Sequence, residues 1–458
     1  MRRGGGSLMR GVEPVAATGH PWFGDHRLAP AAPAETLRHR LRRVLQDTGW
    51  PYQPVLPAAP MTIPRASYAE LFRVAGVLVG LLRRTALETA PTVRERLAVY
   101  QMPASEDQLW LRDPLLEERY ADWVARPDAV IGPDGLRFVE FNVSGALGGA
   151  VETQRRLDVW GGLYADADGR LPYHSPDPFA VRAEMFRALS AELGVAPRVA
   201  IVGSAQVTGV DSYYFEVEAE YHRSRGLPTR FFEPKELHEA WDCPPELRYP
   251  IGLRNFTIPD WNDAGVPTVE VQEALDHGTL LVGTQTATFL HSKLTMGLLS
   301  EGRPWMTATE RSLVNRYLPW TRVLSERRTE RAGEQVDLLP YVLRNRERLV
   351  LKEALGDCGK QVVIGPEVDA VEWEAAVAAG ADGTSIVQEF VPPQTCRVAL
   401  LADGADEPHD AEVAPVLGPL LFGGRPAGLW CRYRTDGAAG IVNARGSATG
   451  ADNAMVAL

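Results

Sequence analysis

The residues best suited to chemistry in this chain are an arginine, two carboxylates and an amide that fall within positions 126–142. Glu140 and Asn142 are two positions apart, so on a strand their side chains would point to the same side. Asp128 precedes a Gly-Pro-Asp-Gly turn and is expected on the partner strand of a hairpin, with Arg126 on the same face. Carboxylate and amide oxygens are typical Mg²⁺ ligands, and a nearby arginine can neutralise a phosphoryl group. The pattern indicates a metal–phosphate site; a solvated hairpin with unrelated charges is the alternative.

Lysine is rare in this chain, and its few positions are therefore informative. The 48 basic residues include only four lysines, which are Lys235, Lys293, Lys352 and Lys360. Lys352 ends an apolar stretch and precedes a loop containing Gly356 and Gly359. Backbone N–H groups of such a loop can cover phosphates, although an ordinary glycine hairpin has the same pattern. Lys293 opens an expected helix, where the helix dipole disfavours a cation unless an anion binds there.

Two later segments complete the set of candidate site residues. Gln388 and Glu389 follow an apolar strand and precede Val391 and a proline. This arrangement could offer backbone donors and acceptors to adenine, or it is simply the end of a buried strand. Arg432 lies on a predicted strand near the end of the chain and is uninformative by itself.

The elements that must position these residues fall into three groups. Helices are predicted over 36–50, 67–90 and 106–125 from apolar residues at helical spacing, followed by a hairpin of strands 128–131 and 136–142. Strands at 198–202, 229–232 and 279–283 alternate with helices at 211–225 and 268–277, which is typical of a small parallel α/β unit. Short strands then dominate, at 348–352, 361–364, 385–389, 396–402, 411–417 and 429–433, around one helix at 370–379. The fold class is therefore α/β, with an α+β second half.

Length and composition limit the functional classes. The chain has 458 residues and a net charge of −11, which argues against a nucleic-acid binder because such proteins need a positive face. The longest apolar run covers nine residues, 74–82, whereas a membrane-spanning helix needs about 20. Four scattered cysteines without a CxxC pair favour a cytoplasmic location. Residues 1–35 are predicted to form a flexible tail. The expected units are 36–190 with the metal-binding hairpin, 195–300 as the small α/β unit and 305–458 as the nucleotide-binding region.

Taken in order, the motifs resemble the ATP-grasp fold in its circularly permuted form, specifically the synthetase domain of glutathionylspermidine synthases. The matching positions are Arg126-Pro-Asp128, Phe138-Val-Glu140-Phe-Asn142, Ser292-Lys293, Lys352 with its glycine loop, Gln388-Glu389, and Pro426-Ala-Gly428 with Arg432. The resemblance covers roughly residues 120–445, and the metal-bearing hairpin precedes the lysines, as in the permuted order. The segment after Asn142 departs from the family pattern, so specificity for glutathione or spermidine is not implied.

The resemblance implies an ATP-dependent carboxylate–amine ligase that forms an amide through an acylphosphate and releases ADP and phosphate. It implies that one or two Mg²⁺ ions are held by Asp128, Glu140 and Asn142. The implied nucleotide contacts are Lys293, Lys352, the loop of Gly356 and Gly359, Lys360, Gln388, Glu389 and Val391. Arg126 and Arg432 would stabilise the transferring phosphoryl group. A small pre-ATP-grasp-like domain is expected at 195–300.

The expected partners are a small-molecule or peptide carboxylate and an amine, with no nucleic acid and no membrane, and a homodimer is left open. Peptide or natural-product biosynthesis is the favoured context. A kinase or a carboxylate–thiol ligase on the same fold, and a catalytically silent nucleotide-binding regulator, remain alternatives.

Overall fold

A computed structural model of the chain describes residues 22–23, 27–102, 108–356, 361–437, 442 and 449–458. Its α-helices are α1 (Ala34–Gln46), α2 (Arg65–Glu88), α3 (Val93–Val99), α4 (Pro114–Arg119), α5 (Ala150–Tyr164), α6 (Pro178–Leu193), α7 (Ala205–Thr208), α8 (Tyr213–Ser224), α9 (Ile258–Asp263), α10 (Val269–Asp276), α11 (Ala287–His291), α12 (Lys293–Glu301), α13 (Ala308–Tyr317), α14 (Leu338–Arg344) and α15 (Ala370–Gly380). Its strands are β1 (Val55–Pro57), β2 (Met61–Ile63), β3 (Val124–Gly132), β4 (Gly135–Val143), β5 (Val199–Val202), β6 (Thr229–Phe232), β7 (Ile251–Arg254), β8 (Leu280–Val282), β9 (Thr321–Ser325), β10 (Arg328–Arg331), β11 (Glu334–Asp337), β12 (Leu349–Glu353), β13 (Val362–Ile364), β14 (Asp382–Glu389), β15 (Cys396–Ala402), β16 (His409–Val413), β17 (Val416–Phe422), β18 (Arg425–Arg434) and β19 (Gly450–Ala457).

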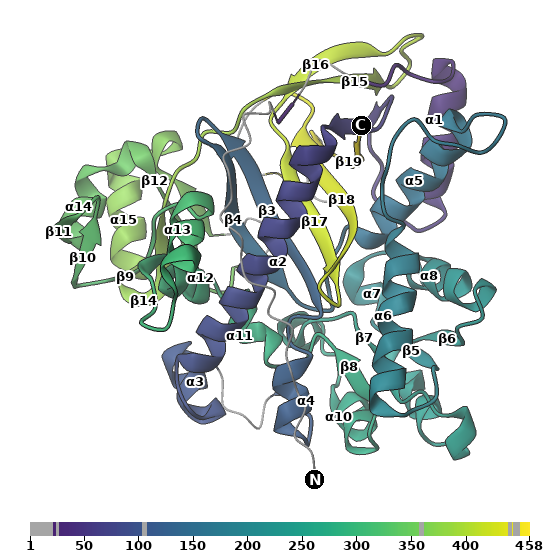
Figure 1. Cartoon of the computed structure of the whole chain (residues 1–458), viewed down its shortest axis with the longest axis horizontal. Helices are drawn as coiled ribbons and strands as arrows, with labels where there is room; N and C mark the ends of the chain where they lie inside the picture. The colour runs from purple at the N-terminus through teal and green to yellow at the C-terminus, as the bar shows by residue number, and fades with distance from the viewer. Residues whose placement is uncertain (1–21, 24–26, 103–107, 357–360, 438–441, 443–448) are drawn as a thin grey trace.

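A six-stranded sheet lies at the centre of the molecule and joins the two ends of the chain. Its order is β2-β19-β18-β17-β3-β4, so the early hairpin β3–β4 lies beside strands from the last 45 residues (Figure 1). The long helix α2 crosses this sheet and buries an almost continuous apolar face, including Leu71, Leu78 and Leu82, against it. The largest hydrophobic cluster is this helix–sheet contact, and it fixes the hairpin that carries the candidate metal ligands.

A second sheet, antiparallel and of order β13-β12-β14-β9, forms the lobe on the left of Figure 1. Helices α14 and α15 pack on it through Val342, Trp373 and Val377. Helix α12 packs beside β9 and β14, where Gly297 allows close approach to Val323 of β9. This sheet places Lys352 on its second strand and the segment 386–389 on its third strand.

The third sheet is the predicted parallel unit. Its order is β6-β5-β7-β8, and all three strand pairs are parallel. The strands are short, buried and apolar, which is the pattern of a parallel sheet covered on both faces. The carboxyl ends of β7 and β8 lead into loops that face the central hairpin. At this contact Gly145 lies against the backbone of Arg254, and a Cβ on Gly145 would be 1.9 Å from the carbonyl oxygen of Arg254.

Most predicted elements are present, and three differences have clear physical causes. The predicted helix over 106–125 is wrong: α4 covers only Pro114–Arg119, because Asp113 caps it and Pro114 opens it, and the chain then enters β3. The single strand predicted at 411–417 is two strands, β16 and β17, divided at Ala414 and Pro415. Strand β19 was not predicted, because Gly450, Asp452 and Asn453 interrupt its first half and its apolar stretch covers only the four residues Ala454–Ala457.

The described part of the segment predicted as a flexible tail contacts the body of the protein. Arg27 forms a two-hydrogen-bond ion pair with Asp410, at 2.9 and 3.1 Å, and helix α1 already begins at Ala34. The remaining boundaries, near 190–195 and 300–305, stay predictions, although the last strands of the region 305–458 belong to the central sheet. Within the described residues, no helix combines the length and apolar character needed to cross a bilayer.

Candidate functional site

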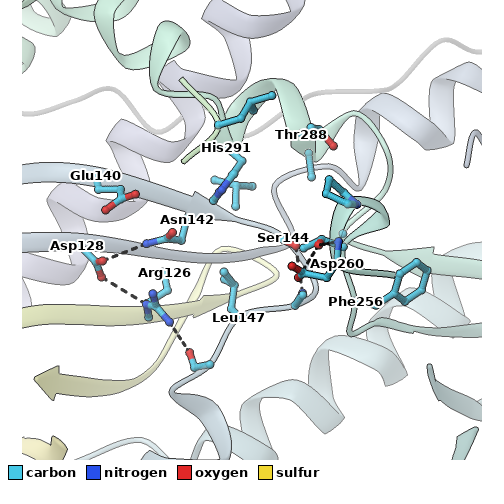
Figure 2. A pocket seen from close by; sticks show the side chains of 18 of the residues that line it. Arg126, Asp128, Glu140, Asn142, Ser144, Leu147, Phe256, Asp260, Thr288 and His291 are labelled. Carbon is cyan, nitrogen blue, oxygen red and sulfur yellow. Dashed lines mark hydrogen bonds and ion pairs between the residues drawn. The ribbon is translucent and has the colours of Figure 1, made fainter. Parts of the chain in front are cut away.

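The hairpin β3–β4 brings the predicted metal ligands together, and a β-bulge between Asp128 and Ala129 supplies the one-residue shift of register that this requires. Asp128 lies directly opposite Glu140, and Arg126 lies directly opposite Asn142. Opposite residues of an antiparallel pair share one face of the sheet, so all four side chains lie on the same side. Figure 2 shows these side chains extending from neighbouring strands toward one cleft.

The Asp128 carboxylate is the centre of a hydrogen-bonded cluster. It accepts hydrogen bonds from Asn142 Nδ2 at 3.1 Å and Arg126 Nε at 3.4 Å, and it pairs with Arg432 Nη2 at 2.6 Å (Figure 2 shows the first two). Asp128 is 5% exposed and Arg126 is 8% exposed. Burial lowers the pKa of Arg126, and the Asp128 carboxylate partly opposes that shift. The cluster joins Arg126 to Arg432, which are 306 positions apart in the sequence.

Two lysines from other elements reach the same hairpin. Lys293, the first residue of α12, places Nζ 3.0 Å from Glu140 Oε1 and donates to Gly356 O at 2.6 Å. Lys352 of β12 donates to Val139 O at 2.9 Å and to Gln388 Oε1 at 2.8 Å. The distant lysines therefore converge on the carboxylate-bearing hairpin.

This arrangement moves the pKa values of Glu140 and Lys352 away from their usual ranges. Burial would raise the pKa of Glu140, but the ammonium groups of Lys293 and Lys352 outweigh it and hold that pKa at about 2. Burial lowers the pKa of Lys352 to about 8, and the Glu140 carboxylate limits this shift. At neutral pH the cluster therefore keeps Glu140 ionised and Lys352 mostly protonated.

The predicted adenine-binding segment lies at the edge of the same cleft. The Gln388 amide is 1% exposed and is held by Lys352 and by Thr321, to which it donates at 3.1 Å. Glu389 pairs with Arg331 at 2.7 Å. The structure therefore gives the Gln388 side chain a role in holding Lys352, while the N–H groups of Glu389 and Phe390 already donate to the carbonyl oxygens of Trp320 and Arg348, each at 2.8 Å.

The cleft has a volume of about 1330 Å³ and is lined by residues of the central sheet, of the sheet β13-β12-β14-β9 and of the parallel sheet, three of the five sheets of the described chain. Of the predicted site residues, it is lined by Arg126, Asp128, Glu140, Asn142, Lys352, Gln388, Glu389, Val391 and Arg432. Lys293 does not line the cleft itself; its Nζ contacts Glu140 and the carbonyl oxygen of Gly356. Gly359 and Lys360 lie outside the described residues.

Sequence reasoning missed the opposite half of this cleft. Arg254, at the carboxyl end of β7, donates from Nη1 to Gln285 Oε1 at 2.9 Å, and burial lowers its pKa to about 10 against the opposing effect of Glu117. Phe256 and Leu147 line the same part and are seen in Figure 2. The signal available was positional: ligands bind at the carboxyl ends of parallel strands, and Arg254 ends a strand there.

The donor set suits a hard cation bound together with phosphates. Among the described residues, no three His, Cys, Asp or Glu side chains gather into one cluster. An ion here would have two carboxylates, Asp128 and Glu140, and the amide oxygen of Asn142. Mg²⁺ typically takes one or two carboxylates and completes its shell with water and substrate phosphate oxygens. The residues present therefore fit Mg²⁺ held jointly with a nucleotide.

Neither a family model nor a curated protein sequence matches this chain. A solved glutathione synthetase-like effector from Globodera pallida matches with a TM-score of 0.58 and 13% identity, over 96% of this chain and 100% of that chain. A putative γ-glutamylcysteine synthetase from Methylobacillus flagellatus is also similar, with a TM-score of 0.37 and 16% identity, over 81% of this chain and 86% of that one. The first match confirms the predicted fold: this chain has the circularly permuted ATP-grasp fold.

Proposed function

We propose that this protein is an ATP-dependent ligase that joins a carboxylate to an amine through an acylphosphate. The observation that carries the proposal is the convergence of Asp128 and Glu140 with Lys293 and Lys352, which come from three separate parts of the chain and meet on one hairpin. Mg²⁺, when bound by Asp128, Glu140 and Asn142, would screen the phosphate charges of ATP.

The proposed reaction has two steps. A carboxylate oxygen attacks the γ-phosphorus of ATP, the bond between that phosphorus and the β–γ bridging oxygen breaks, and ADP leaves. The amine then attacks the carbonyl carbon of the acylphosphate, phosphate leaves with the electrons of the C–O bond, and the amine nitrogen loses a proton. Catalysis of phosphoryl transfer is mainly positioning and charge neutralisation, which cationic side chains can supply.

The charges of the cluster match this task. Four cations, Arg126, Lys293, Lys352 and Arg432, surround two carboxylates, so the described cluster carries a net charge of +2 (four minus two). A triphosphate is a polyanion and would be attracted to this surplus. We assign the two lysines to the phosphates of ATP and the two arginines to the phosphoryl group in transfer.

The part of the cleft at the parallel sheet is assigned to the other substrates. We identify the unit of β5–β8 with a pre-ATP-grasp-like domain, since its strand ends face the hairpin across the cleft. Arg254 is the buried cation there, and Phe256 and Leu147 give the cleft an apolar wall. This half therefore suits a carboxylate-bearing substrate with an apolar portion.

Release of ADP tests the proposal directly. Purified protein is incubated with ATP, Mg²⁺ and a panel of amino acids and amines, and ADP is measured. Glu140→Gln should lower the rate by about 10²–10³-fold, as removal of one transition-state charge partner typically does. Glu184→Gln is the matched control, because Glu184 pairs with Arg425 on the exposed surface. Full activity of folded Glu140→Gln would contradict the assignment; Asn142→Ser provides a second variant should Glu140→Gln not fold.

Isotope transfer tests the acylphosphate. An ¹⁸O-labelled carboxylate must pass one labelled oxygen to the released phosphate, and unlabelled phosphate would rule the intermediate out. Identification of the product as an amide, rather than a phosphoester or thioester, separates the ligase from a kinase and from a carboxylate–thiol ligase.

A further inference from the structure

A single indole ring lies against both arginines of the proposed phosphoryl site. The guanidinium carbon of Arg126 is 4.9 Å from the centre of the Trp430 ring, and that of Arg432 is 4.8 Å from it. Trp430 is 5% exposed, lines the cleft and lies two residues before Arg432 on β18. Cations at this distance from an indole are attracted by its negative face, most strongly where water is excluded.

Two glycines make this arrangement sterically feasible. Arg126 is on β3, and β17 separates it from β18, so its side chain must cross β17 to reach the ring. It does so over Gly418, where a Cβ would lie 3.1 Å from Arg126 Cδ. Gly149 covers the indole, and a Cβ there would lie 2.8 Å from Trp430 Cε3. Small residues on both sides therefore leave room for the ring and for the arginine that crosses to it.

The indole nitrogen is anchored by a carboxylate of the neighbouring strand β19. Trp430 Nε1 donates to Asp452 Oδ2 at 3.1 Å. The other oxygen of Asp452 accepts from Gln53 Nε2 at 2.7 Å and from Arg156 Nη2 at 3.2 Å, and both Asp452 and Arg156 are 0% exposed. The carboxylate is thus fixed by two partners, and the ring that it holds has a fixed orientation.

We propose that Trp430, fixed by Asp452, is a positioning residue that holds Arg126 and Arg432 in the geometry for phosphoryl transfer. The proposal rests on the proposed function for its effect on turnover, but the contacts themselves do not. Two guanidinium groups this close repel each other, and in this cluster Asp128 is their shared carboxylate. The indole face adds a second shared attraction, which limits the orientations that the two arginines can adopt before ATP binds.

Fluorine NMR tests the contact without any need for activity. The protein is labelled with 5-fluorotryptophan, and the Trp430 signal is identified by its absence in Trp430→Phe. Arg126→Met and Arg432→Met should each shift this signal. Arg84→Met is the matched control, because Arg84 stacks at 4.1 Å on another indole, Trp305, and should shift only that signal. A Trp430 signal unmoved in both site variants would overturn the proposal.

Kinetics test the positioning role. Trp430→Leu should lower kcat by about 10- to 100-fold while KM for ATP changes by less than about threefold, because the ring orients the arginines rather than adding affinity. Trp430→Phe keeps an aromatic face and should restore kcat to within about fivefold of the wild type. Trp160→Phe is the control, because Trp160 donates to Asn453, which lies on the same strand β19 as Asp452. This variant also loses a buried indole hydrogen bond, but its kcat should stay within about twofold of the wild type.

The outcomes separate this proposal from the proposed function. Equal losses of kcat in Trp430→Leu and Trp160→Phe would show that the ring is merely structural and would overturn the proposal. Absence of ADP release by the wild type with every substrate would contradict the ligase assignment, and the fluorine shifts would still decide whether the indole holds the two arginines.

Discussion

The strongest pH effect should come from Lys352. Lys352 is 8% exposed, and burial lowers its pKa to about 8, although the carboxylate of Glu140 opposes the shift. If the ammonium binds phosphate, the affinity for nucleotide follows the protonated fraction of Lys352 in the free protein. A lysine with a lowered pKa loses its proton as pH rises through 8, so binding must weaken above that pH.

The size of the effect follows from this pKa. The protonated fraction falls from about 0.8 at pH 7.5 to about 0.03 at pH 9.5, so Kd for Mg-ADP should rise by about 25-fold over this interval. Phosphate ionises near pH 6 and is fully charged across the whole range, so the nucleotide contributes little to the change.

Calorimetry in two buffers with different ionisation enthalpies measures both Kd and proton uptake. Uptake should approach one proton per nucleotide between pH 8.5 and 9.5, since phosphate restores the ammonium form. Lys352→Met should bind more weakly at pH 7.5 and show no comparable slope. A wild-type Kd that is flat over this range, or a Lys352→Met slope equal to that of the wild type, would refute the reasoning.

Two further predictions concern the same cluster. Gly418→Ala should lower kcat by about 10-fold with little change in melting temperature, because the new methyl group displaces Arg126. The control is Gly76→Ala in helix α2, where a Cβ meets nothing within 4 Å; it should leave kcat unchanged and raise the free energy of unfolding by about 0.5–1 kcal/mol. Wild-type turnover in Gly418→Ala would contradict the prediction. Mn²⁺, used as a paramagnetic substitute for Mg²⁺, should bind weakly without nucleotide and at least 10-fold more tightly with ADP. The reason is that Arg432 and Lys293 neutralise the Asp128 and Glu140 carboxylates until phosphate attracts these two side chains away. Electron paramagnetic resonance measures the Mn²⁺ affinity, and equal values with and without ADP would contradict the prediction.

The local part of the site could be predicted from sequence because its periodicity is short-range. Glu140 and Asn142 are two apart and therefore share a face, but the turn alone would set Asp128 opposite Val139. A β-bulge between Asp128 and Ala129, which the sequence did not predict, shifts the register by one residue and sets Asp128 opposite Glu140. Lysine scarcity identified Lys293 and Lys352 for a similar reason: each is a local exception to the use of arginine elsewhere. Both signals can be read without knowing where other segments lie.

The remaining part could not be predicted because it depends on contacts between distant segments. Nothing near Gln388 in the sequence shows that Lys352 occupies its amide, since that contact arises only when β12 pairs with β14. Arg254 looked like one arginine among many until the parallel sheet placed it at the cleft. In its sequence motif only Arg432 was a candidate site residue, and Trp430 was not. The contacts of Trp430 with Arg126 of β3 and Asp452 of β19 arise only in the folded sheet.

The topology of the central sheet explains why the arginine site needs both ends of the chain. Strand β19 lies between β18 and β2, pairs in parallel with β2, and carries Asp452, which anchors the indole. Strand β3, from the first third of the chain, supplies Arg126, and β18 supplies Arg432. The two arginines can therefore meet on Trp430 only after the early hairpin and the last strands have joined one sheet. The geometry that we propose for phosphoryl transfer is thus a consequence of pairing the early hairpin with the last strands in one sheet, and it does not exist in either segment alone.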